Sequence, residues 1–227
     1  VVTWSKNYSS IIAQHISTDG DLLWGDGMAI NNLTASLLSP QPIISSDGNL
    51  LIQWISQTGP VWAADSKLCL QRYNLDGSAI WSEPTVVVGP VVFPMGNWLQ
   101  QSAADGSNGS FSAWTEMSGN VQSAIIQNIT EDGELLWDEG IELSSNFSQF
   151  RMSPKIAVAN NSQELMAVWN VSNGSQSQRG VYAQRVNENG NRLWGINGLP
   201  VVPLNNNYDY LDLSIVEVDE ELITVYI

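Results

Sequence analysis

Acidic side chains are the most numerous groups in this sequence that could do chemistry, and they gather in two short stretches. One stretch contains Asp19, Asp21 and Asp26, and the second spans residues 132–139. Carboxylate oxygens from loops are the ligands that Ca²⁺ takes in proteins. Neither stretch follows a recognised calcium-loop pattern, and the Asp-Gly pairs in them are also typical turn residues. The sequence therefore predicts no cofactor, with Ca²⁺ bound by Asp19, Asp21 and Asp26 as the one alternative.

Residues for other kinds of catalysis are sparse. A Ser-His-Asp triad could use only His15, the single histidine of the chain. A sialidase needs arginines clustered around the substrate carboxylate, and the five arginines here show no such arrangement. A pair of carboxylates for glycoside hydrolysis stays open, with Asp209 and Asp212 or the run 217–221 as the densest sets. We expect no enzymatic activity; an enzyme would need at least two carboxylates in one channel, one with a perturbed pKa.

Four aromatic side chains could form a binding surface, because they stand in expected loops outside the regular pattern of the chain. They are Trp62, Trp98, Tyr208 and Tyr210. Aromatic side chains in such loops can form a platform for sugar rings or for the side chains of a protein partner. The alternative is structural, since the same side chains could plug the ends of a central channel. They are the predicted ligand-binding residues.

Eight Asn-x-Ser/Thr sequons occur, which is more than the composition predicts by chance. The asparagines are Asn7, Asn32, Asn108, Asn128, Asn146, Asn160, Asn170 and Asn173. The excess favours an extracellular, glycosylated chain. The alternative is that Asn- and Ser-rich loops generate sequons that a non-glycosylating host ignores.

The overall charge excludes several classes of partner. Lys and Arg number 8 against 23 Asp and Glu, which gives a formal net charge of −15. Nucleic acids and anionic membranes both favour clustered Lys and Arg, so neither is an expected partner. No apolar run reaches the roughly 20 residues that cross a bilayer, and no signal-peptide pattern opens the sequence. Cys69 is the single cysteine, so no internal disulfide forms, and its apolar neighbours predict a buried thiol.

The strongest feature of the sequence is a repeat of 56–57 residues. Gln14, Gln71, Gln127 and Gln184 are separated by 57, 56 and 57 residues. Trp24, Trp81, Trp137 and Trp194 have the same three spacings. Between each Gln and its Trp stands an Asp-Gly or Asn-Gly pair, which is typical of a hairpin turn. A repeat of this length indicates stacked units that bury their apolar faces against each other.

Each repeat contains four short apolar runs bounded by turn residues, which is the pattern of β-strands. In chain order we name them strand a, strand b, which ends in an aromatic residue, strand c, which carries the Gln, and strand d, which carries the Leu/Ile-Trp pair. Nothing shows a sustained helical period, so we expect almost no helix. Two antiparallel hairpins per repeat make a four-stranded meander, and a repeated meander is the blade of a β-propeller.

Eight of the ten tryptophans occupy the two repeating positions. Trp4, Trp54, Trp114 and Trp169 end strand b, and the four named above stand on strand d. We expect them to pack between neighbouring blades, because a Trp can bury about 150–250 Å². The repeated Gln is expected to bond to backbone groups where the strand ladder is interrupted.

The unit from Tyr182 through Gln184 and Trp194 to Gly198 resembles repeats of secreted and surface proteins from Bacteroidetes-type bacteria. The resemblance implies a β-propeller, often placed upstream of a type IX secretion sorting domain. The second copy departs from it, with Ser82-Glu83-Pro84 after Trp81, and the last copy has Tyr226 in place of a Trp. Residues 17–24 also look like the Asp-box hairpin of sialidases, which is a structural turn and does not imply hydrolysis.

Together these features predict an all-β chain that is a fragment or arc of a larger propeller. The whole range 1–227 is expected to form one region, with units at about 1–41, 42–98, 99–153, 154–210 and 211–227, of which the first and last are partial. The predicted function is a non-enzymatic extracellular binding or scaffold module of a secreted or cell-surface protein. The alternative is a carbohydrate-active enzyme or its sugar-binding accessory propeller. Expected partners are a surface protein or glycan and the remainder of a longer chain.

Overall fold

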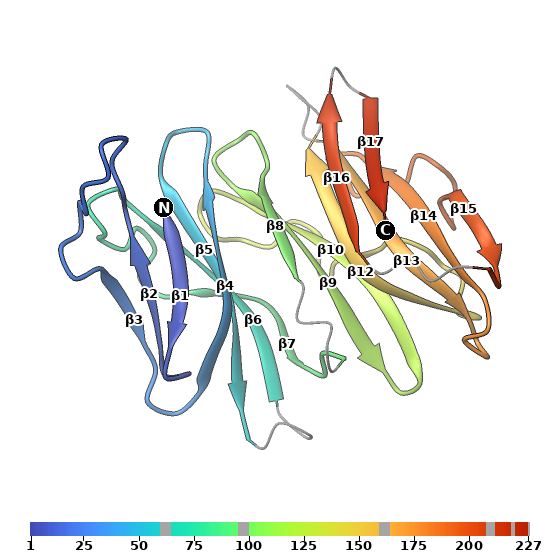
Figure 1. Cartoon of the computed structure of the whole chain (residues 1–227), viewed down its shortest axis with the longest axis horizontal. Helices are drawn as coiled ribbons and strands as arrows, with labels where there is room; N and C mark the ends of the chain where they lie inside the picture. The colour runs from blue at the N-terminus through green and yellow to red at the C-terminus, as the bar shows by residue number, and fades with distance from the viewer. Residues whose placement is uncertain (60–64, 95–99, 159–163, 208–211, 219–220, 227) are drawn as a thin grey trace.

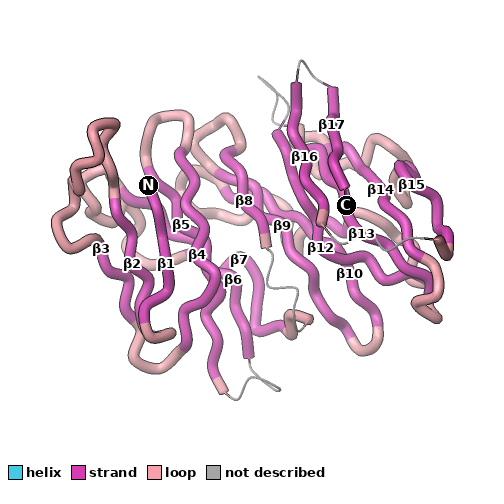
Figure 2. The backbone as a smooth tube through the Cα atoms, in the orientation of Figure 1, coloured by secondary structure: helices cyan, strands magenta, loops and turns pink. Residues whose placement is uncertain are grey.

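The chain consists of strands and turns. The computed structural model describes residues 1–59, 65–94, 100–158, 164–207, 212–218 and 221–226. Within these ranges every regular element is a β-strand, as Figure 2 shows. No helix in the described part of the chain has the length and apolarity needed to cross a bilayer. The expected all-β class is therefore confirmed.

The strands form five antiparallel sheets, which we number as blades 1–5 in chain order. Blade 1 contains β1 (Val2–Lys6), β2 (Ser10–Gln14) and β3 (Met28–Asn31). Blade 2 contains β4 (Ser36–Ile44), β5 (Leu50–Thr58), β6 (Asp65–Tyr73) and β7 (Thr85–Val91). Blade 3 contains β8 (Gln101–Ala104), β9 (Ser110–Ser118), β10 (Val121–Ile129) and β11 (Ile141–Glu142). Blade 4 contains β12 (Gln149–Val158), β13 (Leu165–Asn173), β14 (Arg179–Val186) and β15 (Leu199–Asn205). Blade 5 contains β16 (Leu213–Val218) and β17 (Glu221–Tyr226).

Blades 2, 3 and 4 have the four strands a–d, whereas blade 1 has b, c and d and blade 5 has a and b. In each blade the spatial order of the strands follows their order in the chain. The first strands of successive blades lie side by side: β4 contacts β8, β8 contacts β12, and β12 contacts β16. These strands therefore form the inner edge of the assembly, and the blades follow one another from blue to red in Figure 1.

The bounds of strand d differ from the expected ones. The Leu-Trp pairs do not lie on strand d, because each pair precedes it: β3 begins at Met28, after Trp24. The reason is the repeated Gln. Its side chain, and not the backbone of strand c, binds the backbone of the Trp, so regular pairing with strand c starts only after the Trp.

The repeated Gln side chains bind the backbone around the Trp, as expected. In blade 3, Gln127 Oε1 accepts from the backbone N–H of Trp137 at 3.0 Å, and Gln127 Nε2 donates to the Trp137 carbonyl at 3.3 Å. Gln14 and Gln184 accept from the N–H of Trp24 and Trp194 in the same way, at 3.1 and 2.9 Å. A buried amide thus satisfies backbone groups that the sheet leaves unpaired, which confirms the structural role of these residues.

The turns between strands c and d close around a four-residue loop. In the first, Gly20 N–H donates to the Ser17 carbonyl at 3.1 Å, and Ser17 N–H donates to the Asp21 carbonyl at 2.9 Å. Gly20 has a φ of +90°, which L-residues rarely adopt. The Asp-Gly pair therefore serves the turn, with the glycine in the left-handed region.

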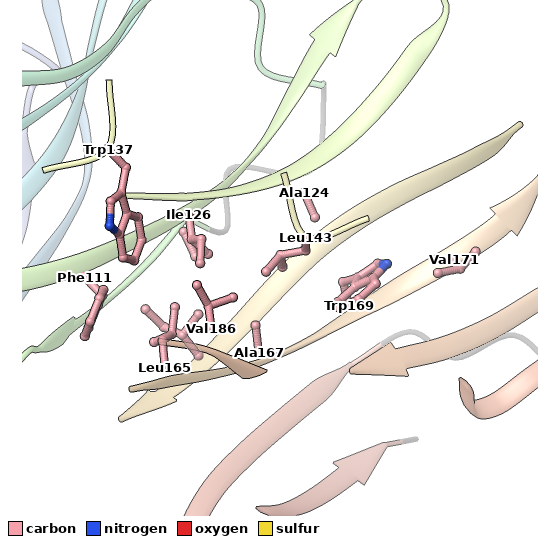
Figure 3. Packing of buried hydrophobic residues seen from close by; sticks show 12 residues of the cluster. Phe111, Ala124, Ile126, Trp137, Leu143, Leu165, Ala167, Trp169, Val171 and Val186 are labelled. Atoms are coloured by element: carbon pink, nitrogen blue, oxygen red, sulfur yellow. The ribbon is translucent and has the colours of Figure 1, made fainter. Parts of the chain in front are cut away.

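The tryptophans at the end of strand b fill the spaces between blades. Trp54, Trp114 and Trp169 are 3%, 1% and 0% exposed, and each belongs to an apolar cluster that includes residues of the preceding blade. Figure 3 shows the cluster between blades 3 and 4, where Trp169 of β13 lies near Leu143 and Ala124 of blade 3. Gly198 permits this packing, because a Cβ there would stand 2.6 Å from Cη2 of Trp169.

The second repeated Trp joins blades 1, 2 and 3 each to the next blade by one hydrogen bond. Trp24 Nε1 donates to the Leu75 carbonyl at 2.8 Å, in the turn of blade 2. Trp81 and Trp137 donate to the carbonyls of Glu131 and Glu188, at 2.9 and 3.2 Å. The acceptor always immediately precedes the Asp-Gly or Asn-Gly pair. Both repeating Trp positions therefore act between blades, as predicted.

Trp4 is the exception among the strand-b tryptophans. It occupies the same repeat position as Trp114 but is 44% exposed, because no blade precedes blade 1 in the structure. The packing of Trp4 between blades therefore stays a prediction.

The single cysteine has the expected structural role. Cys69 on β6 is buried and free, and burial raises the pKa of its thiol to about 11. A thiol with a raised pKa is largely uncharged at neutral pH and is a poor nucleophile.

Arg72 joins blade 2 to blade 3 and also forms an ion pair within blade 2. Arg72 on β6 pairs with Asp47 in the turn between β4 and β5. The same guanidinium donates to the Glu131 carbonyl of blade 3 at 2.9 Å. Asp47 also accepts from the Ser45 hydroxyl at 2.6 Å. The Ser45 hydrogen bond, together with those from Asn49 and the charge of Arg72, lowers the pKa of Asp47 from 3.8 to about 2.

This pKa predicts a pH dependence of stability. Because the pKa is lower in the folded chain than in the unfolded chain, Asp47 contributes stability above pH 4 and loses it as the pH falls toward 2. We expect the urea midpoint of wild type to exceed that of Asp47→Asn at pH 6, and the difference to shrink at pH 2.5. The check is urea denaturation at both pH values by circular dichroism; an unchanged difference would contradict the assignment.

Candidate functional site

The four predicted ligand-binding aromatics lie outside the described residues. Trp62, Trp98, Tyr208 and Tyr210 belong to the ranges 60–64, 95–99 and 208–211. Their proposed role as a binding platform stays a prediction.

The predicted calcium ligands do not come together. Asp19, Asp21 and Asp26 are exposed around the first turn between strands c and d. The backbone N–H groups of Asp19 and Asp21 donate to the Ser17 hydroxyl at 3.2 and 3.0 Å, so the turn is closed without a metal. Among the described residues, no three His, Cys, Asp or Glu side chains form a group that could hold a metal ion. The geometry of these three residues therefore gives the calcium alternative no support.

The sequons differ in their access to solvent. Asn7 is exposed at the turn between β1 and β2. Asn128 is 4% exposed on β10, so the prediction of a glycan there is wrong for the folded chain, which has no space for one. Asn160 lies outside the described residues. The others are half-buried: Asn32, Asn108, Asn146, Asn170 and Asn173.

The inner strands present amide and hydroxyl groups. Gln100 Nε2 donates to the Ser39 carbonyl at 2.9 Å, and the Ser102 hydroxyl donates to Gln41 Oε1 at 3.3 Å, so these side chains join β4 to the start of blade 3. β4, β8 and β12 contain no Asp or Glu. Their one lysine is Lys155, which is half-buried on β12. Burial lowers the pKa of Lys155, and the negative charge of Asp212 offsets part of this shift.

A groove lies between blades 2 and 3, and two of the hydrogen bonds that join these blades, which we call ties, bound it. At one tie, the Thr85 hydroxyl donates to the Gly133 carbonyl at 2.8 Å. At the other, Met117 N–H donates to the Val92 carbonyl at 3.0 Å. Between these ties the strands enclose a hollow of about 690 Å³, which we call the acidic groove.

The two walls of the acidic groove differ in chemistry. The first wall is residues 86–91 of β7, the last strand of blade 2, and none of them is charged. Six consecutive residues line the hollow, which indicates that an edge of the strand faces it, because one face of a strand would present only alternate residues. Ile125 and Leu135 add apolar surface from blade 3.

The second wall carries four carboxylates on blade 3. They are Glu116, Asp138, Glu139 and Glu142. Glu116 accepts weakly from Trp114 Nε1 at 3.4 Å, and Glu142 lies 3.5 Å from the guanidinium of Arg151. Among the described residues, the pair of Glu142 with Arg151 is the one ion pair that a carboxylate of the groove forms. Asp138 and Glu139 also border a second hollow of about 680 Å³ toward Asn189 of blade 4.

Part of this groove was visible in the sequence. The stretch 132–139 stood out as acidic, but Glu116 and Glu142 lie on other strands. The pairing of Ile125 with both Trp114 and Glu142 brings these strands together. A composition-based search could not have found the groove, because it depends on how blade 3 is spaced from blade 2.

Comparison with protein families gives no match. No family model matches the chain, and no curated protein sequence matches it. The resemblance to Bacteroidetes-type surface repeats therefore stays a prediction.

Comparison with solved structures shows the fold. The chain is similar to an α-L-arabinanase of Penicillium chrysogenum, with a TM-score of 0.51 and 12% identity over 84% of this chain and 57% of that one. It is similar to a GH32 β-fructofuranosidase of Bombyx mori, with a TM-score of 0.51 and 10% identity over 96% of this chain and 51% of that one. A glycosyl hydrolase from Bacteroides ovatus gives a TM-score of 0.51 and 9% identity over 95% and 67%.

These likenesses identify the architecture as part of a β-propeller. The chain spans little more than half the length of the first two solved structures. The predicted fold class, an arc of four-stranded propeller blades, is confirmed.

Proposed function

We propose that this chain is a non-enzymatic recognition module within a larger propeller protein that acts outside the cell or at its surface. The observation that carries the proposal is the chemistry of the inner strands. β4, β8 and β12 bring amides, hydroxyls and Lys155 to the inner edge and contain no carboxylate, and the fourth inner strand, β16, contains a single carboxylate, Glu217. Glycoside hydrolysis requires two carboxyl groups facing one bond, one as acid and one as base or nucleophile.

Binding is supported by the contrast between this inner edge and the acidic groove. The inner side chains are largely occupied in joining blades to one another, as Gln100 and Ser102 show. The groove instead leaves most of its carboxylates without an ion-pair partner among the described residues, beside an uncharged strand edge. A surface that combines apolar contact with unpaired charge is suited to a partner of opposite charge.

The second candidate is a carbohydrate-active propeller, either an enzyme or a sugar-binding accessory domain. What favours it is the likeness of the fold to glycosidases, at 9–12% identity. Folds of this kind carry many unrelated functions, so the likeness is an analogy and does not assign the activity.

A test for hydrolysis separates the two candidates. The purified chain is incubated with arabinobiose, sucrose and p-nitrophenyl α-L-arabinofuranoside, and released product is measured over hours. We expect no release above the protein-free blank. Release that disappears in Asp212→Asn, which changes the described carboxylate that interacts with Lys155, would overturn the proposal in favour of the enzyme.

A further inference from the structure

We infer that the acidic groove is a docking site for an extended, cationic peptide segment of a partner protein. This inference rests on the proposed recognition function and names the class of partner. Four features of the groove support it: its length between two ties, the exposed edge of β7, the uncharged wall and the carboxylate wall.

The shape of the groove favours an extended segment. Thr85 and Val92, the tied residues, bracket the six residues of β7 that line the hollow. β7 ends the strand order of blade 2, so one of its edges lacks a paired strand of its own sheet. An extended peptide can lie in the groove beside this edge, with one set of side chains toward β7 and the other toward blade 3.

The chemistry of the walls specifies alternating side chains. Successive side chains of an extended peptide point to opposite sides. One set would contact Val88 and its neighbours, and the other would face Glu116, Asp138 and Glu139 across the groove. Apolar residues alternating with Lys or Arg satisfy both walls. A cation that approaches these carboxylates also gains from charge steering at low salt.

A second copy of the same chain is a poor occupant. The chain carries a net charge of −15 and has eight Lys and Arg in total. Arg72, Arg151 and Arg185, on strands β6, β12 and β14, are already engaged in ion pairs within the chain. Two such chains repel each other, and the groove would meet few cations. The partner is therefore a different, basic protein segment.

The test is a binding titration with a defined probe. A fluorescein-labelled peptide Lys-Val-Lys-Val-Lys is titrated with the protein, and its anisotropy gives Kd at about 20 and 150 mM NaCl. The groove variant is Glu116→Gln/Asp138→Asn/Glu139→Gln. The matched control is Asp19→Asn/Asp21→Asn/Asp26→Asn, which removes the same charge from an exposed turn of blade 1.

We expect the groove variant to raise Kd by about ten-fold or more and the control variant by less than about two-fold. Replacing the valines of the peptide by glycine should also weaken binding, because the apolar wall loses its contact. Equal weakening by both triple variants would overturn the inference, since the peptide would then respond to net charge alone. Absence of binding to the wild-type chain would overturn it as well.

The outcomes for the two proposals are distinguishable. Failure of the peptide to bind, with no hydrolysis in the sugar assay, removes the cationic partner and leaves the recognition function. Hydrolysis that depends on Asp212 removes the recognition function, whatever the peptide does. Circular dichroism of each variant confirms that the fold is retained.

Discussion

Replacing Trp114 by alanine is expected to destabilise the chain by about 3–5 kcal/mol. Trp114 is 1% exposed and lies in the cluster between blades 2 and 3, together with Leu51, Leu68 and Ile125. Removing the indole leaves a cavity where the two sheets meet, and strands of neighbouring blades cannot collapse into it without breaking their own ladders. The measurement is guanidinium denaturation followed by far-ultraviolet circular dichroism.

Trp4→Ala provides the matched control, because Trp4 stands at the same position of the repeat. It is 44% exposed and has no preceding blade to contact. We expect its replacement to cost less than about 1 kcal/mol. Similar losses for the two variants would contradict the view that each strand-b Trp stabilises the fold through the blade before it.

Replacing Arg151 by leucine is expected to cost about 3 kcal/mol. Arg151 is 0% exposed on β12, at the contact with blade 3. Its guanidinium donates to the Ser144 carbonyl, to the Ser123 hydroxyl at 2.8 Å and to the Gln122 carbonyl at 3.4 Å. β11, the outer strand of blade 3, has only two residues. Arg151 therefore supplies hydrogen-bond donors to acceptors of blade 3 that a longer outer strand would pair. Leucine leaves these buried acceptors without partners.

The control for Arg151 is Arg185→Leu. Arg185 pairs with Glu164, but both side chains are partly exposed, at 33% and 26%. A pair that solvent reaches is worth about 1 kcal/mol or less. We expect Arg151→Lys to remain destabilised, since one ammonium cannot reproduce the guanidinium fork. A loss for Arg185→Leu as large as for Arg151→Leu would show that removing a positive charge, and not the buried contacts, causes the effect.

The repeat made most of the fold predictable. The regular spacing of Gln127 and Trp137 and their equivalents located every blade, because each repeated sheet makes the same contacts with the same positions of the repeat. The exact bounds of the strands were harder to predict. Strand d begins after the Trp, because the Gln side chain interrupts the backbone pairing there. The buried role of Arg151 was not predictable, because it compensates for an outer strand whose length no local pattern specifies.

The candidate site was less predictable than the fold. Off-repeat aromatics such as Trp62 suggested a platform, but these residues lie outside the described ranges. The acidic groove combines Glu116 on β9, Asp138 in a turn and Glu142 on β11 with the edge of β7. These groups come together only because blades 2 and 3 lie at a certain distance from each other. The number of residues between them in the sequence does not predict that distance.

The most direct test of the recognition site is photo-crosslinking with the probe peptide. Its central valine is replaced by benzoylphenylalanine, and crosslinked protein fragments are identified by mass spectrometry at about 150 mM NaCl. We predict that the crosslinks fall on residues 86–91 and 135–142, the two walls of the acidic groove. Crosslinks concentrated at the exposed acids of residues 19–26, or spread over the surface without preference, would contradict the assignment of the groove.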